Sequence, residues 1–294
     1  MAAPDPGGDS DRDSRSSGGS VFRGGPLTYL TLTLGALLST VPLYWMLVVA
    51  SRTTDAVNDV PPVFIPGGRL GENVNRVLED PNASFLTGLI NSIIVSSVVT
   101  VTTVLFGSLA GFAFAKLRFR GKNALLLFIL ATMMVPIQLG VIPLLILMTK
   151  LEWQSQLQSV IVPFMVSGFA VFLMRQYASE AVPDELIEAA RVDGCATLRI
   201  YWNIVLPALR PAAAVLGLLT FMQTWNEFFW PCVVLQDTRN PTVQISLRML
   251  NLTFYADYSL VFAGTAMAIV PLLLVFVLFG KQIIGGIMEG AVKA

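Results

Sequence analysis

The sequence of 294 residues contains no histidine and only two cysteines. Without histidine, the paired imidazoles of zinc proteases and the serine–histidine pair of acyl-transfer enzymes are excluded. Cys195 falls in a polar segment and Cys232 in an apolar one, so the two are not expected to meet, and neither a disulfide nor a zinc framework is predicted. We therefore expect no catalytic residue of these types and no metal site.

Charge is also scarce. Charged residues make up 13% of the chain and hydrophobic residues 54%, whereas a soluble domain carries about 25% charged residues. The net charge is zero, and no basic patch is interleaved with aromatic residues, which argues against a nucleic-acid partner. The composition indicates a protein embedded in membrane lipid.

Six charge-poor stretches predict the membrane spans, since a charge at the bilayer centre costs about 2.5–3.5 kcal/mol on insertion scales. Each stretch supplies the roughly 20 residues that a spanning helix needs. We predict an all-α fold, a polytopic membrane domain over residues 26–294 preceded by a disordered cytoplasmic tail over 1–25, which is rich in glycine, serine and charge. The predicted spans lie near residues 27–50, 85–115, 124–148, 158–177, 211–235 and 260–280.

The distribution of lysine and arginine predicts the orientation, because positive loops remain in the cytoplasm. With six spans, thirteen of the 19 lysine and arginine residues fall on the side of the two termini and six on the other. Both termini are therefore predicted to be cytoplasmic. The segment 51–84, punctuated by proline and glycine, is expected to form the longest external loop.

Small residues and prolines mark two of the spans. Gly107 and Gly111 have the four-residue spacing that lets two membrane helices approach closely, although small residues recur in most such helices. Pro136 and Pro143 are expected to bend or break the third span. A kinked helix can line a pathway, but membrane prolines are also common where neighbouring groups satisfy the freed carbonyls.

One carboxylate, Glu227, falls within a predicted span, and Trp225 and Asn226 precede it. An ionisable residue inside a membrane predicts a functional site. The same stretch also fits the outer interface, where tryptophans anchor helices and a carboxylate costs little. Both interpretations remain open from the sequence, and the three residues are candidates for a solute pathway.

The segment 179–209 is longer than a turn between two spans requires. Pro183 suits the first turn of a helix and Gly194 suits the left-handed residue that stops it, which predicts a helix over 183–193. A second helix over 196–205 is expected to end before Pro207. The first helix carries small and charged side chains but no large apolar face opposite lysines, so it favours docking onto a protein over lying on a bilayer.

The segment contains Glu188, Ala189 and Ala190, then Asp193 and Gly194, and after nine intervening residues Ile204, followed by Leu206 and Pro207. This set of residues at this spacing matches a loop signature, and with it the segment resembles the cytoplasmic loop of permease subunits in bacterial ABC importers. The chain is further similar to the carbohydrate branch of that family, which includes the maltose and glycerol-3-phosphate permeases. Further matches are Asn91-Ser92, Ala110 to Ala115, Met134 to Pro136, Trp225 to Phe228 and Glu289 to Lys293.

The resemblance implies a sugar-transporting subunit in the bacterial cytoplasmic membrane. It implies that residues 183–194 form a coupling helix on an ATPase dimer, with Glu188 making polar contacts, Gly194 setting the turn, and the residues 204–207 holding the loop. The implied partners are a homologous second permease, the ATPase dimer, which would hold ATP and magnesium, and an extracellular solute-binding protein. This chain is expected to hold no cofactor and to be no enzyme.

Two other classes, a transporter driven by an ion gradient and a membrane enzyme, fit the sequence less well, and the sequence also lacks a nucleotide-binding motif. No phosphate-binding loop occurs, since Gly121-Lys122 is followed by asparagine and Gly280-Lys281 lacks serine or threonine, so the nucleotide site is expected elsewhere. A transporter driven by an ion gradient usually needs several carboxylates or histidines within the membrane. A membrane enzyme would need catalytic groups that the absence of histidine removes.

Overall fold

The computed structural model describes residues 25–57, 60, 62–237, 239–251 and 257–292, with side chains of the last helix as far as Gly280. The predicted tail over 1–25 lies outside these residues except for Gly25. Every regular element that is described is a helix, so the predicted all-α class is confirmed. The chain forms two compact units, residues 1–46 and 47–294.

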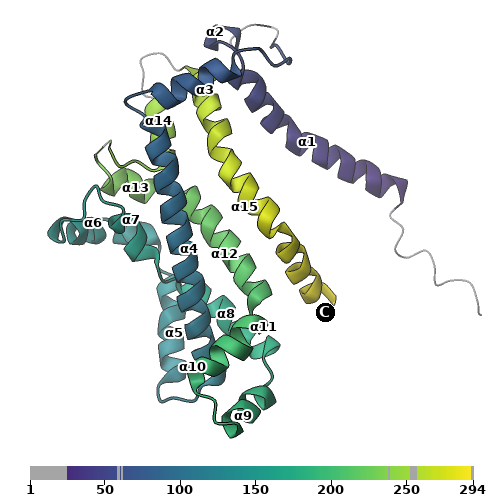
Figure 1. The fold of residues 1–294 in the computed structure, drawn as a ribbon, viewed down its shortest axis with the longest axis vertical. Helices are drawn as coiled ribbons and strands as arrows, with labels where there is room; N and C mark the ends of the chain where they lie inside the picture. The colour runs from purple at the N-terminus through teal and green to yellow at the C-terminus, as the bar shows by residue number, and fades with distance from the viewer. Residues whose placement is uncertain (1–24, 58–59, 61, 238, 252–256, 293–294) are drawn as a thin grey trace, which may run out of the picture. The chain divides into compact units, whose positions relative to one another are not determined.

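Helices follow one another along the whole described chain (Figure 1). In order they are α1 (Pro26–Ala50), α2 (Thr54–Val57), α3 (Leu70–Glu79), α4 (Phe85–Lys116), α5 (Lys122–Met133), η1 (Ile137–Gly140), α6 (Val141–Lys150), α7 (Gln158–Ile161), η2 (Val162–Phe164), α8 (Gly168–Ala181), α9 (Asp184–Val192), α10 (Thr197–Ile200), the π-helix η3 (Tyr201–Val205), α11 (Leu206–Ala208), α12 (Arg210–Trp225), α13 (Phe229–Val234), α14 (Val243–Leu250) and α15 (Tyr258–Val292).

Four helical stretches among the described residues are long and apolar enough to cross a membrane by themselves: Pro26–Ala50, Phe85–Lys116, Gln158–Ala181 and Tyr258–Gly280. Two bent helix pairs qualify if each pair counts as one span. The first joins Lys122–Met133 to Ile137–Lys150 at 90°, and the second joins Thr197–Ala208 to Arg210–Trp225 at 77°. The described chain thus provides four to six spans.

Two helices pack closely through the predicted glycine pair. A Cβ atom on Gly107 would lie 2.8 Å from the Cβ of Ala170, and one on Gly111 would lie 2.7 Å from backbone atoms of Met174 and Arg175. Real Cβ atoms do not approach other heavy atoms so closely, so α4 and α8 need both glycines for this contact. The predicted close approach at the glycine spacing is confirmed.

Proline and hydrogen bonding break two of the predicted spans. Pro136 lies at the 90° bend, because its ring removes a backbone donor and clashes with the preceding turn. Pro143 is tolerated in the first turn of α6, where no intrahelical donor is needed.

The span expected over 211–235 is not one helix. It stops after Trp225 and resumes at Phe229, where the Glu227 carboxylate accepts a hydrogen bond from the Trp230 backbone N–H (3.1 Å).

The segment predicted as an external loop contains α3, which lies at the same end of the second unit as α14 (Figure 1). The Asn73 side chain in α3 donates hydrogen bonds to the carbonyls of Ala50 (2.8 Å) and Arg52 (2.9 Å). Arg76 in the same helix pairs with Asp257 at 2.6 Å. α3 therefore joins the end of α1 to the start of α15.

Asp257 is the centre of this network, because it also accepts hydrogen bonds from Thr54, Ser259 (2.6 Å) and the Leu260 backbone N–H (3.1 Å). Burial alone would raise the pKa of the Asp257 carboxyl, but the hydrogen bonds from Ser259, Thr54 and Arg76 outweigh burial and hold that pKa well below its usual range. The carboxylate stays ionised in the folded chain.

Replacing Asp257 with asparagine is expected to lower the apparent melting temperature by about 4–8 °C, since losing charged hydrogen bonds costs about 2 kcal/mol. The folded pKa is depressed, so the stabilisation is complete above the unfolded value of about 4 and is lost only as pH falls through the folded value. Thermal unfolding in detergent should therefore show the same difference at pH 5 and pH 8. Asp55→Asn, at an exposed aspartate of α2, is the control; equal losses in both variants would contradict the network.

Candidate functional site

α9 lies with α10 at the end of the second unit opposite α3 and α14 (Figure 1). Asp184 and Glu185 occupy its first turn and Arg191 its last, which complements the helix dipole. Gly194 follows with φ +76°, the left-handed conformation that glycine adopts at low cost. The predicted helix and its glycine stop are confirmed, with α9 covering Asp184–Val192 of the expected 183–193.

The inner face of α9 is part of a buried cluster. Ile187 and Ala190 are buried with Phe112 of α4 and Tyr201 of η3. The Tyr201 hydroxyl shares a 2.7 Å hydrogen bond with the Ser108 hydroxyl of α4, and both side chains are fully buried. This cluster fixes the 179–209 segment to the ends of α4 and α8.

The outer face of α9 presents apolar side chains to solvent. Leu186 is 50% exposed and Val192 87% exposed, and Leu198 of α10 is 65% exposed. Glu185, Glu188 and Ala189 are exposed on the same helix. We call Leu186, Glu188, Ala189, Val192 and Leu198 the outer face of the loop.

The structure divides the residues of the loop signature into two groups. Glu188, Ala189, Asp193 and Gly194 are exposed, whereas Ala190 points into the buried cluster. Ile204, Leu206 and Pro207 are half-buried, and the first two pack against that cluster. The second predicted helix, over 196–205, is α10 followed by the π-helix η3. Ala189 therefore lies on the exposed face of α9 and Ala190 on its buried face. The sequence pattern did not reveal this difference.

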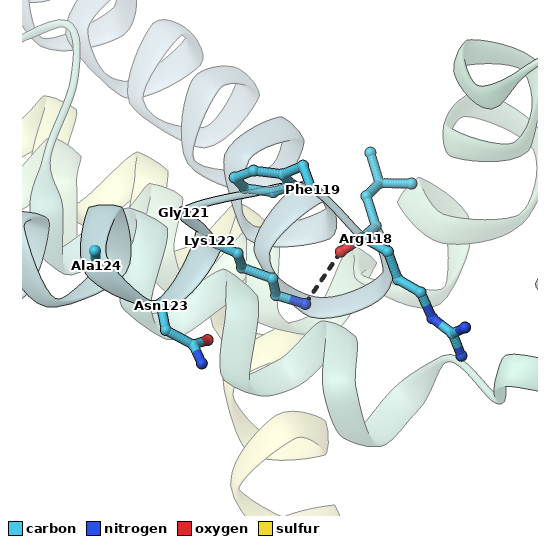
Figure 2. A pocket seen from close by; sticks show the side chains of 7 residues that line it. Arg118, Phe119, Gly121, Lys122, Asn123 and Ala124 are labelled. Atoms are coloured by element: carbon cyan, nitrogen blue, oxygen red, sulfur yellow. Dashed lines mark hydrogen bonds between the residues drawn. The ribbon is translucent and has the colours of Figure 1, made fainter.

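A basic hairpin, residues 116–122, connects α4 to α5 beside α9. Its Lys122 ammonium donates to the Leu117 carbonyl (3.1 Å), as Figure 2 shows, in a small hollow of about 390 Å³. Lys116 pairs with Asp184 at 2.8 Å, and this hydrogen bond, with the positive charges of the hairpin, lowers the pKa of Asp184. Because the Asp184 side chain is exposed, the pair is weak in energy, but it places the first turn of α9 against the hairpin.

A cavity of about 1320 Å³ lies among α4, the α5–η1–α6 bend, the start of α8, α12 and α13. Its wall is mostly apolar and includes both sides of the bend at Pro136. Polar side chains line one side along α12: Thr220, Gln223, Thr224 and Glu227. Gln223 and Thr224 lie three and four residues after Thr220, which places these three on one face of α12, and Glu227 lies two residues beyond the end of that helix.

The three pathway candidates occupy different environments. Glu227 lines the cavity. Trp225 is 1% exposed and its ring stacks on Phe221 at 5.7 Å within the core. The Asn226 side chain donates back to the Met222 carbonyl at 2.8 Å, which helps to end α12. Only Glu227 of the three belongs to the cavity wall.

Sequence reasoning missed most of the cavity. Ser92, Ser96 and Thr103 of α4 line it, and their spacing along one helical face is the signal that could have indicated a polar wall. The described residues contain no group of three carboxylate or cysteine side chains placed to hold a metal.

The family described as binding-protein-dependent transport system inner membrane component matches residues 103–282. The chain is 33% identical to the arabinooligosaccharides transport system permease protein AraQ of Halalkalibacterium halodurans, over 91% of this chain and 98% of that protein. It is 33% identical to the lactose transport system permease protein LacG of Rhizobium radiobacter, over 90% and 95%. It is 29% identical to the sn-glycerol-3-phosphate transport system permease protein UgpE of Yersinia enterocolitica, over 89% and 95%.

Among solved structures, the fold matches a chain of a bacterial ABC transporter involved in the import of the acidic polysaccharide alginate. The TM-score is 0.76 with 25% sequence identity, covering 87% of this chain and 95% of that one. The family match covers more than half of this chain, and the first relatives match nearly their full length. The chain therefore belongs to the binding-protein-dependent inner membrane transport components, as a multi-pass permease subunit, not an enzyme, of an ABC importer of sugars or sugar-related solutes.

Proposed function

We propose that the 179–209 segment couples this subunit to a separate ATPase dimer, which binds ATP and magnesium. The observation that carries this proposal is the outer face of the loop. Large apolar side chains stand exposed there beside carboxylates, although the helix lies at the polar end of the spans. Such a surface fits a protein partner.

The inner face gives the proposal its mechanism. Movement of α9 would pass to α4 and α8 through the cluster of Ile187, Phe112 and Tyr201, because these side chains are buried and close-packed. Closure of the ATPase on ATP would then shift the equilibrium between two arrangements of the spans, as differential affinity for the two states requires. The signature residues that belong to this cluster or pack against it are Ala190, Ile204 and Leu206, and Pro207 follows them in the segment that holds the loop.

The remaining partners follow from the family. A homologous second permease completes the pathway, an extracellular solute-binding protein delivers the solute, and both termini of this chain are cytoplasmic. The stretch Trp225–Glu227 belongs to the pathway, with Glu227 facing the cavity and Trp225 and Asn226 fixing the helix end. The named relatives carry arabinooligosaccharides, lactose or glycerol 3-phosphate, which supports a solute of this chemistry here.

A single cysteine on the outer face tests the coupling proposal. In a Cys195→Ser, Cys232→Ser background, Val192→Cys is expected to form a cross-link to the ATPase subunit with a short bifunctional thiol reagent, provided that a cysteine is present on the facing surface. Immunoblotting of membranes that contain the whole complex gives the measurement.

The control places the same cysteine at Arg69, an exposed residue directly before α3, the helix that lies at the opposite end of the second unit from α9 (Figure 1). Arg69→Cys should give no cross-link to the ATPase and should react with a membrane-impermeant thiol reagent added outside intact cells. Two results would contradict both the coupling assignment and the orientation. The first is a cross-link from Arg69→Cys to the ATPase. The second is no cross-link from a cysteine at any outer-face position, including Leu186 and Leu198.

A further inference from the structure

The cavity beside α12 carries one kind of charge. Of the residues that line it, all within the described part of the chain, Glu227 is the single ionisable one, and neither lysine nor arginine is present. The salt bridges found among the described residues do not involve Glu227. Arg248 lies over the neighbouring Phe228 ring at 5.7 Å but does not line the cavity. The wall therefore presents a negative charge that no lining cation neutralises.

The polar face of α12 continues from that carboxylate. Gln223 is exposed and lines the cavity. Thr220 and Thr224 lie on the same face and are half-buried. Amides and hydroxyls both donate and accept, and a carboxylate accepts up to four hydrogen bonds. This face can bind many hydroxyl groups but offers no cationic donor for a carboxylate or phosphate.

Glu227 also has a structural role, since one of its oxygens accepts the Trp230 N–H. One such bond leaves the second carboxylate oxygen for another donor. The exposed Phe229 ring lines the cavity next to it, and an apolar surface beside polar groups is usual for sites that bind small molecules. The volume of about 1320 Å³ is larger than the roughly 300–1,000 Å³ of common ligand pockets, so it admits more than one sugar ring.

We propose that this cavity accepts uncharged, polyhydroxylated solutes of oligosaccharide size, and that Glu227 is the residue that disfavours anionic ones. The inference rests on the proposed function of this chain as half of a solute pathway, and it narrows the solute class. Among the named relatives it groups the chain with importers of neutral sugars rather than of glycerol 3-phosphate or alginate.

The test compares matched solute pairs. The purified complex without its extracellular binding protein is dialysed against a mixture of neutral di- and trisaccharides and their aldonic acids, in which one reducing end is oxidised to a carboxylate, and bound solute is identified by mass spectrometry. The wild type is expected to favour the neutral member of each bound pair by about tenfold, the size of effect that two like charges about 8 Å apart produce at an intermediate dielectric.

Glu227→Gln should bring this ratio close to one, because glutamine keeps an oxygen for the Trp230 N–H but removes the charge. Glu180→Gln, an equal change of charge at an exposed residue outside the cavity, should leave the ratio unchanged. Three results would overturn the inference. The wild type could bind the aldonic acids as well as the neutral sugars, or Glu227→Gln could leave the ratio of bound neutral sugar to bound acid unchanged. The third is a complex that binds no sugar in dialysis but still imports sugar. Absence of ATP-driven uptake of every sugar by the full system would instead reject the proposed function.

Discussion

Replacing Glu188 by arginine is expected to reduce ATP-driven solute uptake by about tenfold or more, since a reversed charge buried at a docked interface costs at least 2 kcal/mol. Glu188 lies on the outer face of the loop, whereas Ile187 and Ala190 hold the helix from inside. The variant should therefore insert and fold normally, and the loss should appear in communication with the ATPase. Proteoliposomes containing the whole complex allow uptake and ATP hydrolysis to be measured together.

The two measurements separate uncoupling from failure to assemble. Uncoupling predicts that hydrolysis continues but no longer rises when the loaded solute-binding protein is added. Glu180→Arg is the matched control, because it makes the same change of charge at an exposed residue of α8 that belongs to the same segment but not to the outer face of the loop. If Glu188→Arg transported as well as this control, the outer face would not be the coupling surface.

Replacing Gly111 by alanine is expected to destabilise the membrane domain by about 3 kcal/mol, near the upper end of the usual cost of overpacking. The added methyl group would lie 2.7 Å from backbone atoms of Arg175 and Met174, and backbone in the middle of a packed helix cannot move aside as a flexible side chain does. The apparent melting temperature in detergent should fall by about 6–12 °C, with a matching loss of protein recovered as folded complex.

Gly217 of α12 provides the control for this substitution. A Cβ atom there would meet Thr100 at 3.6 Å and Val104 at 3.7 Å, which is ordinary van der Waals contact. Gly217→Ala should leave stability unchanged or raise it slightly, since alanine favours the helix by about 1 kcal/mol over glycine. Equal melting temperatures for the two alanine variants would show that α4 and α8 do not depend on their close approach.

The sequence predicts well those features that single residues or composition determine. Gly194 and Pro136 determine backbone geometry locally, and both have the predicted effect, a helix stop and a bend. Charge-poor stretches indicate where helices can cross a membrane, and the glycine pair in α4 indicates a close contact. These features depend on local backbone conformation or on the transfer of side chains into lipid. They can therefore be predicted without knowing which residues lie nearby in the folded chain.

Features that depend on contacts between distant residues were not predictable. Apolar residues resume after Asn226 and Glu227, and the composition does not distinguish one span from a helix that stops and restarts with the Glu227–Trp230 hydrogen bond. α14 contains polar and charged residues and lies between two predicted spans, yet it packs where Gly88 leaves room for Ser246. Likewise, the opposite roles of Ala189 and Ala190 depend on the cluster behind α9.

The right-angle bend at Pro136 has a consequence for where hydrocarbon can touch the subunit. At 1.5 Å per residue, α5 extends about 18 Å and α6 about 15 Å, so neither half alone crosses a hydrocarbon layer of about 30 Å. Backbone carbonyls freed by such a break have no partner among lipid tails. The side that carries the bend, which is also a wall of the cavity, must therefore face water or protein. Acyl chains are confined to the other sides, where unbroken helices satisfy their own hydrogen bonds.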